Sequence, residues 1–361
     1  MRADEVRRRA SARTVGRGKA VVLPTASSST RWSSGGVTVQ LGDSLESYAA
    51  WTPPDVIVSD GAYGVLGFEG DTSDHLGLPA WYEPHVSAWA KHAKLGTTLW
   101  FWNSEIGWAA VHPVLERHGF RYVNANVWNK GIAHIAGNVN TKKIRRFPVV
   151  TEICVQYVRE ARIGGLVLKE WLLREWKRTR LPLRAANAAC GVADAAVRKY
   201  LDQGHLWYWP PVDMFRNLAN YANEHGRPDG RPYFSMDGKR PMTDEEWALT
   251  RSKFRCPHGV TNVWDHPPLH GAERVTHEGK AVHLNQKPLA LMERILRASS
   301  DVGDVVWEPF GGLFSASVAS MRLGRRAFSC EIDPTYFHYG VERLVREPSS
   351  GPDLLCAPSR P

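Results

Sequence analysis

The stretch that decides the fold runs from Asp304 to Asp333 and reads DVVWEPFGGLFSASVASMRLGRRAFSCEID. An apolar run typical of a strand leads through two glycines into a helix that ends at Gly324, and a second strand follows. A strand, a tight glycine turn, a helix and another strand are typical of a doubly wound sheet. The stretch therefore predicts an α/β fold.

The glycine pair of this stretch is a candidate ligand site. Gly311 and Gly312 would let the backbone approach a ligand closely, and Glu331 lies where doubly wound folds place a carboxylate for ribose hydroxyls. The dinucleotide fingerprint G-x-G-x-x-G is absent, and Glu308 would repel a pyrophosphate but could receive a cationic amino-acid end. These features suggest S-adenosylmethionine, while a simple tight turn explains the glycine pair about equally well.

Strands and helices alternate along the rest of the chain. Strands are predicted at 36–43, 55–60, 97–104, 121–131 and 148–158, and helices at 81–93 and 289–299. From about residue 160 the sequence becomes helical and basic and then loop-rich, and the α/β pattern resumes near residue 261. The simplest organisation is one α/β domain with an insertion of roughly 100 residues.

Composition narrows the class of protein. The 361 residues are 43% hydrophobic, which allows a sizeable core, and no apolar run approaches the roughly 20 residues that span a bilayer. The five cysteines are scattered without a CxxC pair, so we expect no metal site and no disulfide framework, as suits a reducing cytoplasm. The formal net charge of +9 favours a polyanionic partner.

A second informative stretch is VIVSDGAYG at 56–64, where Asp60 and Tyr63 follow an apolar strand. Five further stretches accompany it in a fixed order: LGDSLESY (41–48), VWNKG (127–131), TEICVQYV (151–158), NVWDHPPLHGAERVTHEGKAVHLNQKP (262–288) and WEPFGGLFSAS (307–317). Together they resemble the permuted, beta-type family of amino-methylating DNA methyltransferases. The resemblance covers roughly residues 37–345 and implies a Rossmann-like class I methyltransferase fold with a mixed, mostly parallel sheet.

The resemblance also implies roles for individual residues. In the catalytic motif D/S/N-P-P-Y/F, Asp60 would accept a hydrogen bond from the target amine, the Gly61 carbonyl would accept a second, and Tyr63 would stack on the flipped base. The residues implied to bind S-adenosylmethionine are Asp43, Asn285, Lys287, Glu308, Phe310, Gly311, Gly312 and Glu331. The sequence departs from the family where Gly61 and Ala62 replace two prolines and Leu284 replaces a third.

On this basis we expect five parts. These are a disordered basic arm (1–35), the catalytic half of the methyltransferase domain (36–160), a target-recognition insertion (161–260), the cofactor-binding half (261–346) and a flexible tail (347–361). The implied partner is double-stranded DNA, and the implied location is the cytoplasm. We expect no membrane partner. The resemblance also allows a restriction-modification setting with a cognate endonuclease, and a homodimer.

Within the insertion, LPLRAANAACGVADAAVRKYLDQG (181–204) has the pattern of a helix-turn-helix with Gly191 in the turn. The second helix of such a motif lies in the major groove. The predicted DNA-binding residues are Arg180, Arg184, Arg198 and Lys199. An ordinary helical pair packed on the domain is the structural alternative.

Several functions stay open at this point. An Asp in the first motif position favours adenine N6 as the target. Ser59 stands just before Asp60 and could align with that position instead, so cytosine N4 is the alternative. A DNA-binding protein that has lost turnover is a second class. Methylation of RNA is a third possibility. The helix pair makes it less favoured, because such a pair reads a major groove, and the major groove of A-form RNA is too narrow for side chains to read.

Overall fold

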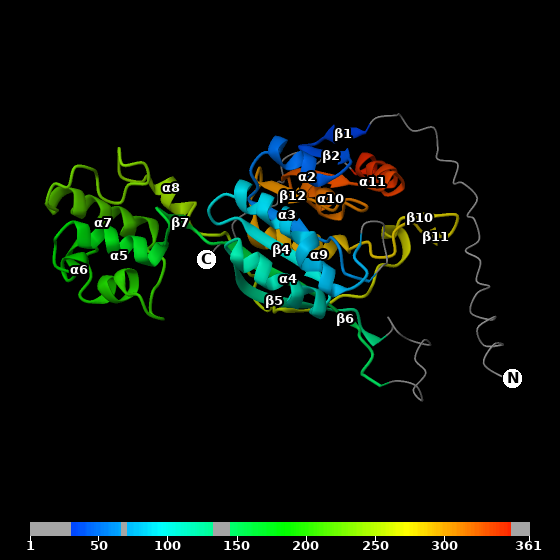
Figure 1. Cartoon of the computed structure of the whole chain (residues 1–361), viewed down its shortest axis with the longest axis horizontal. Coiled ribbons are helices and arrows are strands. Elements are labelled where there is room, and N and C mark those ends of the chain that lie inside the picture. The colour runs from blue at the N-terminus through cyan, green and yellow to red at the C-terminus, as the bar shows by residue number, and fades with distance from the viewer. Residues whose placement is uncertain (1–29, 66–70, 133–144, 348–361) are drawn as a thin grey trace. The chain divides into compact units, whose positions relative to one another are not determined.

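The computed structural model, which describes residues 30–65, 71–132 and 145–347, is built on one large sheet (Figure 1). Within the described residues its strand order is β1-β2-β13-β12-β3-β4-β6-β5-β9. The strands are β1 (Arg31–Ser34), β2 (Val37–Leu41), β3 (Val56–Ser59), β4 (Thr98–Asn103), β5 (Phe120–Asn129), β6 (Thr151–Arg159), β9 (Val263–Asp265), β12 (Val305–Glu308) and β13 (Arg326–Glu331). The strands from β2 to β4 in this order run parallel, and β6 and β1 run antiparallel to their neighbours. The predicted mixed, mostly parallel sheet is confirmed.

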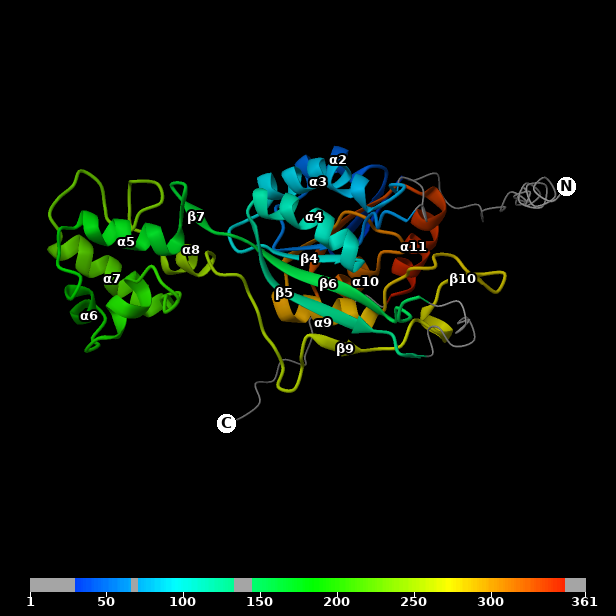
Figure 2. The ribbon, with the colours of Figure 1, turned by 60° about the horizontal axis from the view of Figure 1, so that its bottom comes forward.

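Helices cover both faces of this sheet, with α3 and α4 on one side and α9 and α10 on the other (Figure 2). The helices of the sheet domain are α2 (Ser44–Ser47), α3 (Leu78–His92), α4 (Glu105–Arg117), α9 (Leu289–Ser299), α10 (Ser315–Arg322) and α11 (Pro334–Arg346), with short 3-10 turns η1 (Tyr48–Ala50), η2 (His75–Gly77) and η5 (Gly271–Glu273). A small hairpin joins β10 (Thr276–His277) to β11 (Lys280–Ala281). No helix in the described ranges is long and apolar enough to cross a membrane.

Strand β3 shows why the central strands read as continuous apolar runs. Successive side chains of a strand point to opposite faces, and here both faces are covered. Val56 and Val58 pack in the cluster with α9 and α10, while Ile57 packs in the cluster with α3 and α4. Every residue of β3 is buried, so the strand does not show the alternation of apolar and polar residues that is typical of a half-exposed strand.

Strands β3 and β12 lie side by side, although about 250 residues separate them. Val56 pairs with Val306 and Ile57 with Trp307 in parallel register. From this pair the chain continues to β4 on one side and to β13 on the other. The carboxyl ends of β3 and β12 therefore form the switch point where open α/β sheets bind ligands.

The insertion has a hydrophobic cluster of its own. Its elements are the hairpin β7 (Arg162–Ile163) and β8 (Leu166–Val167), then α5 (Leu168–Arg178), α6 (Ala185–Ala189), the π-helix η4 (Val197–Leu201), α7 (Val212–His225) and α8 (Asp244–Ala248). The rings of Phe215 and Trp247 stack with centroids 4.0 Å apart, and Trp171 and Trp176 are fully buried beside them. This cluster provides the segment with its own core.

The described residues reach two of the predicted boundaries. The arm expected at 1–35 overlaps strand β1, in which Arg31 pairs with Gln40 and Ser34 with Val37. The arm's end is therefore wrong, because these residues add an edge to the sheet, and residues 1–29 lie outside the described part. Of the tail expected at 347–361, only Glu347 is described, and it accepts two hydrogen bonds from Arg322.

Candidate functional site

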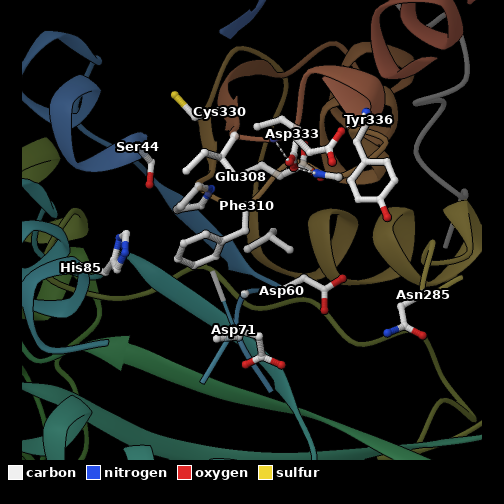
Figure 3. Close-up of a pocket in the computed structure, with 18 of the residues that line it drawn as sticks. Ser44, Asp60, Asp71, His85, Asn285, Glu308, Phe310, Cys330, Asp333 and Tyr336 are labelled. Carbon is white, nitrogen blue, oxygen red and sulfur yellow. Dashed lines mark hydrogen bonds between the residues drawn. The ribbon is translucent and has the colours of Figure 1, made fainter. Parts of the chain in front are cut away.

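A cavity of about 510 Å³ lies beyond the carboxyl ends of β2, β3, β12 and β13 (Figure 3). The loops that follow these strands, helix α3 and the segment before α9 provide its walls. All eleven residues predicted from the sequence as catalytic or cofactor-binding line it: Asp43, Asp60, Gly61, Tyr63, Asn285, Lys287, Glu308, Phe310, Gly311, Gly312 and Glu331. The fold thus brings together residues from both ends of the described chain.

The loop that carries Asp60 and Tyr63 is held without the two prolines. A Cβ on Gly61 would lie 2.7 Å from the Phe310 ring and 2.9 Å from the Tyr82 hydroxyl, so only glycine fits there. The Ala62 carbonyl accepts hydrogen bonds from Tyr82 Oη (3.0 Å) and from Asn103 Nδ2 (2.9 Å). Both donors are fully buried. Packing and hydrogen bonds therefore fix a loop that Gly-Ala alone would leave flexible.

Asp60 and Tyr63 belong to a polar cluster with Lys287 and Glu152. Lys287 Nζ lies 2.7 Å from Asp60 Oδ1 and 2.9 Å from Glu152 Oε1. Tyr63 Oη lies 2.9 Å from Asp60 Oδ1 and 2.6 Å from Glu152 Oε1, so one hydroxyl proton has two acceptors. Lys130 Nζ lies 2.9 Å from Glu152 Oε2. The resemblance implies a cofactor contact for Lys287, whereas its ammonium here binds two carboxylates, one of them Asp60.

Burial and charge oppose each other in this cluster. Burial would raise the pKa of Glu152, but the ammonium groups of Lys287 and Lys130 lower it to about 2. Burial raises the pKa of Asp60, Lys287 opposes the rise and the charge of Glu152 adds to it. Burial would lower the pKa of Lys287, but the two carboxylates raise it above its usual value. Glu152 and Lys287 are therefore fixed charges, and Asp60 is the carboxylate whose charge responds to them.

The glycine loop after β12 takes its shape from contacts within the protein. A Cβ on Gly311 would clash with the Phe314 ring and lie 2.8 Å from Ser329 Oγ. Gly312 has a φ of +53°, in the left-handed region that favours glycine. Its N–H donates to Glu331 Oε2 at 2.6 Å. The protein needs Gly311 for its own packing and Gly312 for its backbone conformation, which differs from the close ligand approach that the sequence suggests.

Glu308 caps helix α10 from the end of β12. One carboxylate oxygen accepts a hydrogen bond from the Ala316 N–H (2.7 Å), and the other accepts from the Ser317 N–H (2.8 Å) and hydroxyl (2.6 Å). Burial raises the pKa of Glu308 to about 7, although these hydrogen bonds lower it. The sequence suggests that this carboxylate receives a cationic amino-acid end. In the structure both its oxygens serve the positive end of a helix dipole.

Two other carboxylates of the cavity are fixed by backbone groups. Asp43 Oδ1 caps α2 by accepting from the Leu45 N–H at 2.9 Å. Glu331 accepts from Gly312 and, through Oε1, from the Asp333 N–H at 2.8 Å. Burial raises the pKa of Glu331 to about 7. Both carboxylates are held in fixed positions on the wall of the cavity.

The segment expected to be a helix-turn-helix consists of two short helical pieces. After α6, Gly191 turns the chain with a φ of +64°, and the second piece spans only 195–201. A hydrogen bond of 3.1 Å from the Val197 N–H to Asn187 Oδ1 ties the two pieces together. The predicted DNA-binding side chains are all exposed: Arg180, Arg184, Arg198 and Lys199. The pieces are shorter than the sequence pattern predicts, and their contact with DNA stays a prediction.

Four residues of the site escape sequence reasoning: Lys130, Glu152, Tyr82 and Asn103. Glu152 lies 89 positions from Tyr63, so no local pattern links them. One signal was available, since Glu152 precedes the apolar run ICVQYV of a strand that proves to be buried from Ile153 to Val158. A carboxylate at the edge of such a run needs a cationic partner.

Curated relatives match parts of the chain. The DNA adenine methyltransferase YhdJ of Escherichia coli (strain K12) is 39% identical over 83 residues, which are 23% of this chain and 27% of that protein. The type II methyltransferase M.ScaI of Streptomyces caespitosus is 30% identical over 169 residues, 45% of this chain and 50% of that protein. The chain spans half or less of the length of these two relatives.

Solved structures resemble the chain only distantly. The complex of M1.HpyAVI with SAM has a TM-score of 0.48 and 16% identity, over 85% of this chain and 98% of that one. PvuII DNA methyltransferase (cytosine-N4-specific) has a TM-score of 0.47 and 12% identity, over 85% and 86%. Similarity at this level indicates neither substrate nor cofactor.

A family model gives the wider match. It is the N6/N4 methyltransferase model, described as DNA methylase, and it covers residues 54–342. This range begins just before β3 and ends within α11, so it includes the loops of Asp60, Gly311 and Glu331. The chain therefore belongs to the N6/N4 family of DNA methylases.

Proposed function

We propose that this protein transfers a methyl group from S-adenosylmethionine to the exocyclic amine of a base flipped out of duplex DNA, with adenine N6 as the favoured target. One observation carries the proposal. Asp60 and Tyr63 follow β3 and line the same cavity as the glycine loop that follows β12. A group that accepts an amine hydrogen and a site suited to a nucleoside thus share one enclosure.

The groups on the cavity wall suit S-adenosylmethionine. The cofactor, when bound, supplies an electrophilic methyl group on its sulfonium sulfur. The fixed carboxylates of Asp43 and Glu331 are acceptors for the adenine and ribose ends. Phe310 offers a half-buried ring, and Asn285 adds an amide (Figure 3). Lys287 is absent from this set, because its ammonium is held by Asp60 and Glu152.

Asp60 makes the target amine a better nucleophile. An exocyclic amine is weakly nucleophilic, because its lone pair is delocalised into the ring. The Asp60 carboxylate accepts one N–H and the Gly61 carbonyl accepts the other, so electron density on the nitrogen rises as it gains the methyl group. The nitrogen then loses one proton, and Asp60 can take it. The Tyr63 ring stacks on the base and replaces the stacking lost on flipping.

The register of the motif supports adenine. Ser59 is the last residue of β3 and is fully buried, whereas Asp60 opens the loop and lines the cavity. This supports Asp60, not Ser59, as the first motif position, which the family often pairs with adenine. Cytosine N4 is the alternative target.

The test is to incubate the protein with unmethylated genomic duplex DNA and methyl-labelled S-adenosylmethionine, and then to identify the labelled nucleoside by mass spectrometry. We expect N6-methyladenine. Labelled N4-methylcytosine would support the alternative target. DNA binding without any labelled nucleoside would instead indicate a DNA-binding protein that has lost turnover.

Glu331→Ala is expected to weaken binding of S-adenosylmethionine, because the ribose hydroxyls lose an ionised acceptor. Since the pKa of Glu331 is raised to about 7, the wild-type affinity should fall as the pH drops through 7 and the carboxylate gains a proton. Calorimetry between pH 6 and pH 8, values spanning that pKa, measures both effects. Glu342→Ala, on the surface of α11, is the matched control. Equal affinity and equal pH dependence in Glu331→Ala would place the ribose elsewhere.

Arg198→Ala and Lys199→Ala are expected to weaken DNA binding and to leave cofactor binding unchanged. Loss of a residue that contacts a base costs about 1–3 kcal/mol of binding free energy and relaxes specificity at one position. Loss of a phosphate contact weakens binding to all sequences alike. The guanidinium fork of Arg198 suits guanine, so we expect it to read a base. The measurement is affinity for cognate and scrambled duplexes at two salt concentrations, with the exposed Arg346→Ala as control. Unchanged affinities would assign residues 180–201 to packing.

A further inference from the structure

Glu152 takes no direct part in the proposed methyl transfer, yet it occupies the centre of the polar cluster. Its side chain is only 12% exposed. Oε1 of Glu152 contacts Lys287 and Tyr63, the same two groups that contact Oδ1 of Asp60. Two carboxylates, one from the loop after β3 and one from β6, therefore share one ammonium and one hydroxyl.

We propose that Glu152 is a positioning residue, which sets how strongly Asp60 accepts the target amine by competing with it for Lys287 and Tyr63. The proposal rests on the proposed function and deepens it. While Glu152 is present, the single charge of Lys287 is divided between two carboxylates. Without it, the ammonium would bind Asp60 alone and draw electron density away from the amine.

The geometry of the cluster favours this competition. Lys287 is 3% exposed, so its ammonium depends on its carboxylate partners for compensation of its charge. Glu152 sits on β6, which pairs with β4 on one side and β5 on the other and so cannot shift easily. By accepting from the Tyr63 hydroxyl it also ties the loop of Asp60 to the start of β6. This tie acts in addition to Tyr82 and Asn103, which hold the Ala62 carbonyl.

Several ionisable groups surround Asp60 in the cluster. Burial raises the pKa values of the Tyr63, Tyr82 and Cys154 side chains well above their usual values, so these stay neutral. Glu152, with a pKa of about 2, stays ionised, and the pKa of Lys287 is raised. Lys130 faces Glu152, and Asp71 on the neighbouring loop binds the N–H groups of Gly64 and Val65. Asp60 is therefore the carboxylate of the pair whose pKa burial raises.

Glu152→Gln tests the proposal, because glutamine keeps the size of the side chain and removes its charge. We expect kcat to fall roughly tenfold, with the KM for DNA little changed, since a carboxylate of lower pKa is a weaker acceptor of the amine. The acidic limb of the kcat profile, at saturating cofactor, should move to lower pH by about one unit, because a nearby negative charge no longer raises the pKa of Asp60. Glu152→Asp, which restores the charge, should return the limb toward its wild-type position.

A second readout needs no substrate. Carbon-13 NMR of labelled aspartate carboxyls, with Asp60→Asn to assign the signal, gives the pKa of Asp60 in the wild type and in Glu152→Gln. A lower value in the variant supports the proposal. Glu342→Gln, an exposed partner of Arg346, is the control and should change neither readout.

Three outcomes separate the possibilities. An unchanged Asp60 pKa with unchanged kcat in Glu152→Gln would overturn the proposal. A lower melting temperature with an unchanged kcat per folded molecule would also overturn it, because Glu152 would then only stabilise the fold. A wild-type protein that methylates no DNA would remove the proposed function, while the Asp60 titration would still decide whether the two carboxylates share Lys287.

Discussion

Replacing Asp60 by alanine is expected to abolish methyl transfer while leaving the affinity for S-adenosylmethionine nearly intact. In the proposed mechanism the carboxylate accepts the target N–H, and a preorganised acceptor of this kind stabilises a transition state by on the order of 3 kcal/mol, or more than a hundredfold in rate. The lost rate should appear in kcat rather than in cofactor binding, because the proposed mechanism places Asp60 against the base. Single-turnover methylation and calorimetry of cofactor binding measure the two effects.

Asp60→Asn is the matched variant for this experiment, since it keeps the shape of the side chain and one acceptor oxygen. We expect it to be slower than the wild type and faster than Asp60→Ala. The melting temperature of both variants should also be measured, because loss of this carboxylate leaves Lys287 with Glu152 as its remaining acidic partner in the cluster. Turnover near the wild-type rate in a folded Asp60→Ala protein would contradict the catalytic role.

Lys287→Met is expected to destabilise the fold by about 3–5 kcal/mol, the typical cost of breaking a buried ion pair by removing one partner. Methionine fills a similar volume, but Asp60 and Glu152 would then face each other with Lys130 as the nearest cation. Urea unfolding measures the loss. The deficit should shrink as the pH falls, because the folded variant would take up protons on the two carboxylates and lose their repulsion.

Lys94→Met is the control for this stability prediction. Lys94 also binds a carboxylate, with Nζ 2.9 and 2.8 Å from the two oxygens of Asp55, but its side chain is 39% exposed. Exposed pairs of this type contribute about 0–1 kcal/mol. If the two variants lost equal stability, or if the Lys287→Met deficit were constant with pH, the buried cluster would not hold the charges as described.

The sheet could be predicted because its signal is local. Each central strand is a short apolar run between turn residues. Helix α4 was missed because Gly107 and Pro113 interrupt its pattern, although Ser104 caps it. Strand β1 was missed because its residues, RWSS, are mostly exposed and pair only at the sheet edge.

The chemistry of individual side chains was harder to predict, because it depends on partners far away in the chain. The partner of Asp60 lies 227 positions away at Lys287, and no spacing rule reaches so far. The position of Glu308 in the sequence suggests a ligand contact, but the residue serves as a helix cap. This role is set by the turn of Gly311 and Gly312. The helix-turn-helix pattern gave the right turn at Gly191 and overestimated the helices, since small residues such as Ala185 and Ala186 fit short pieces equally well.

The pairing of β3 with β12 has a consequence for how the protein is made. Val56 must meet Val306 across an intervening chain that includes an entire second cluster, and such distant pairings form slowly. A chain that has left the ribosome only as far as β9 carries Asp60 and Glu152 but neither Lys287 nor the glycine loop. The cavity therefore cannot be completed until the insertion, with its own hydrophobic cluster, has been synthesised.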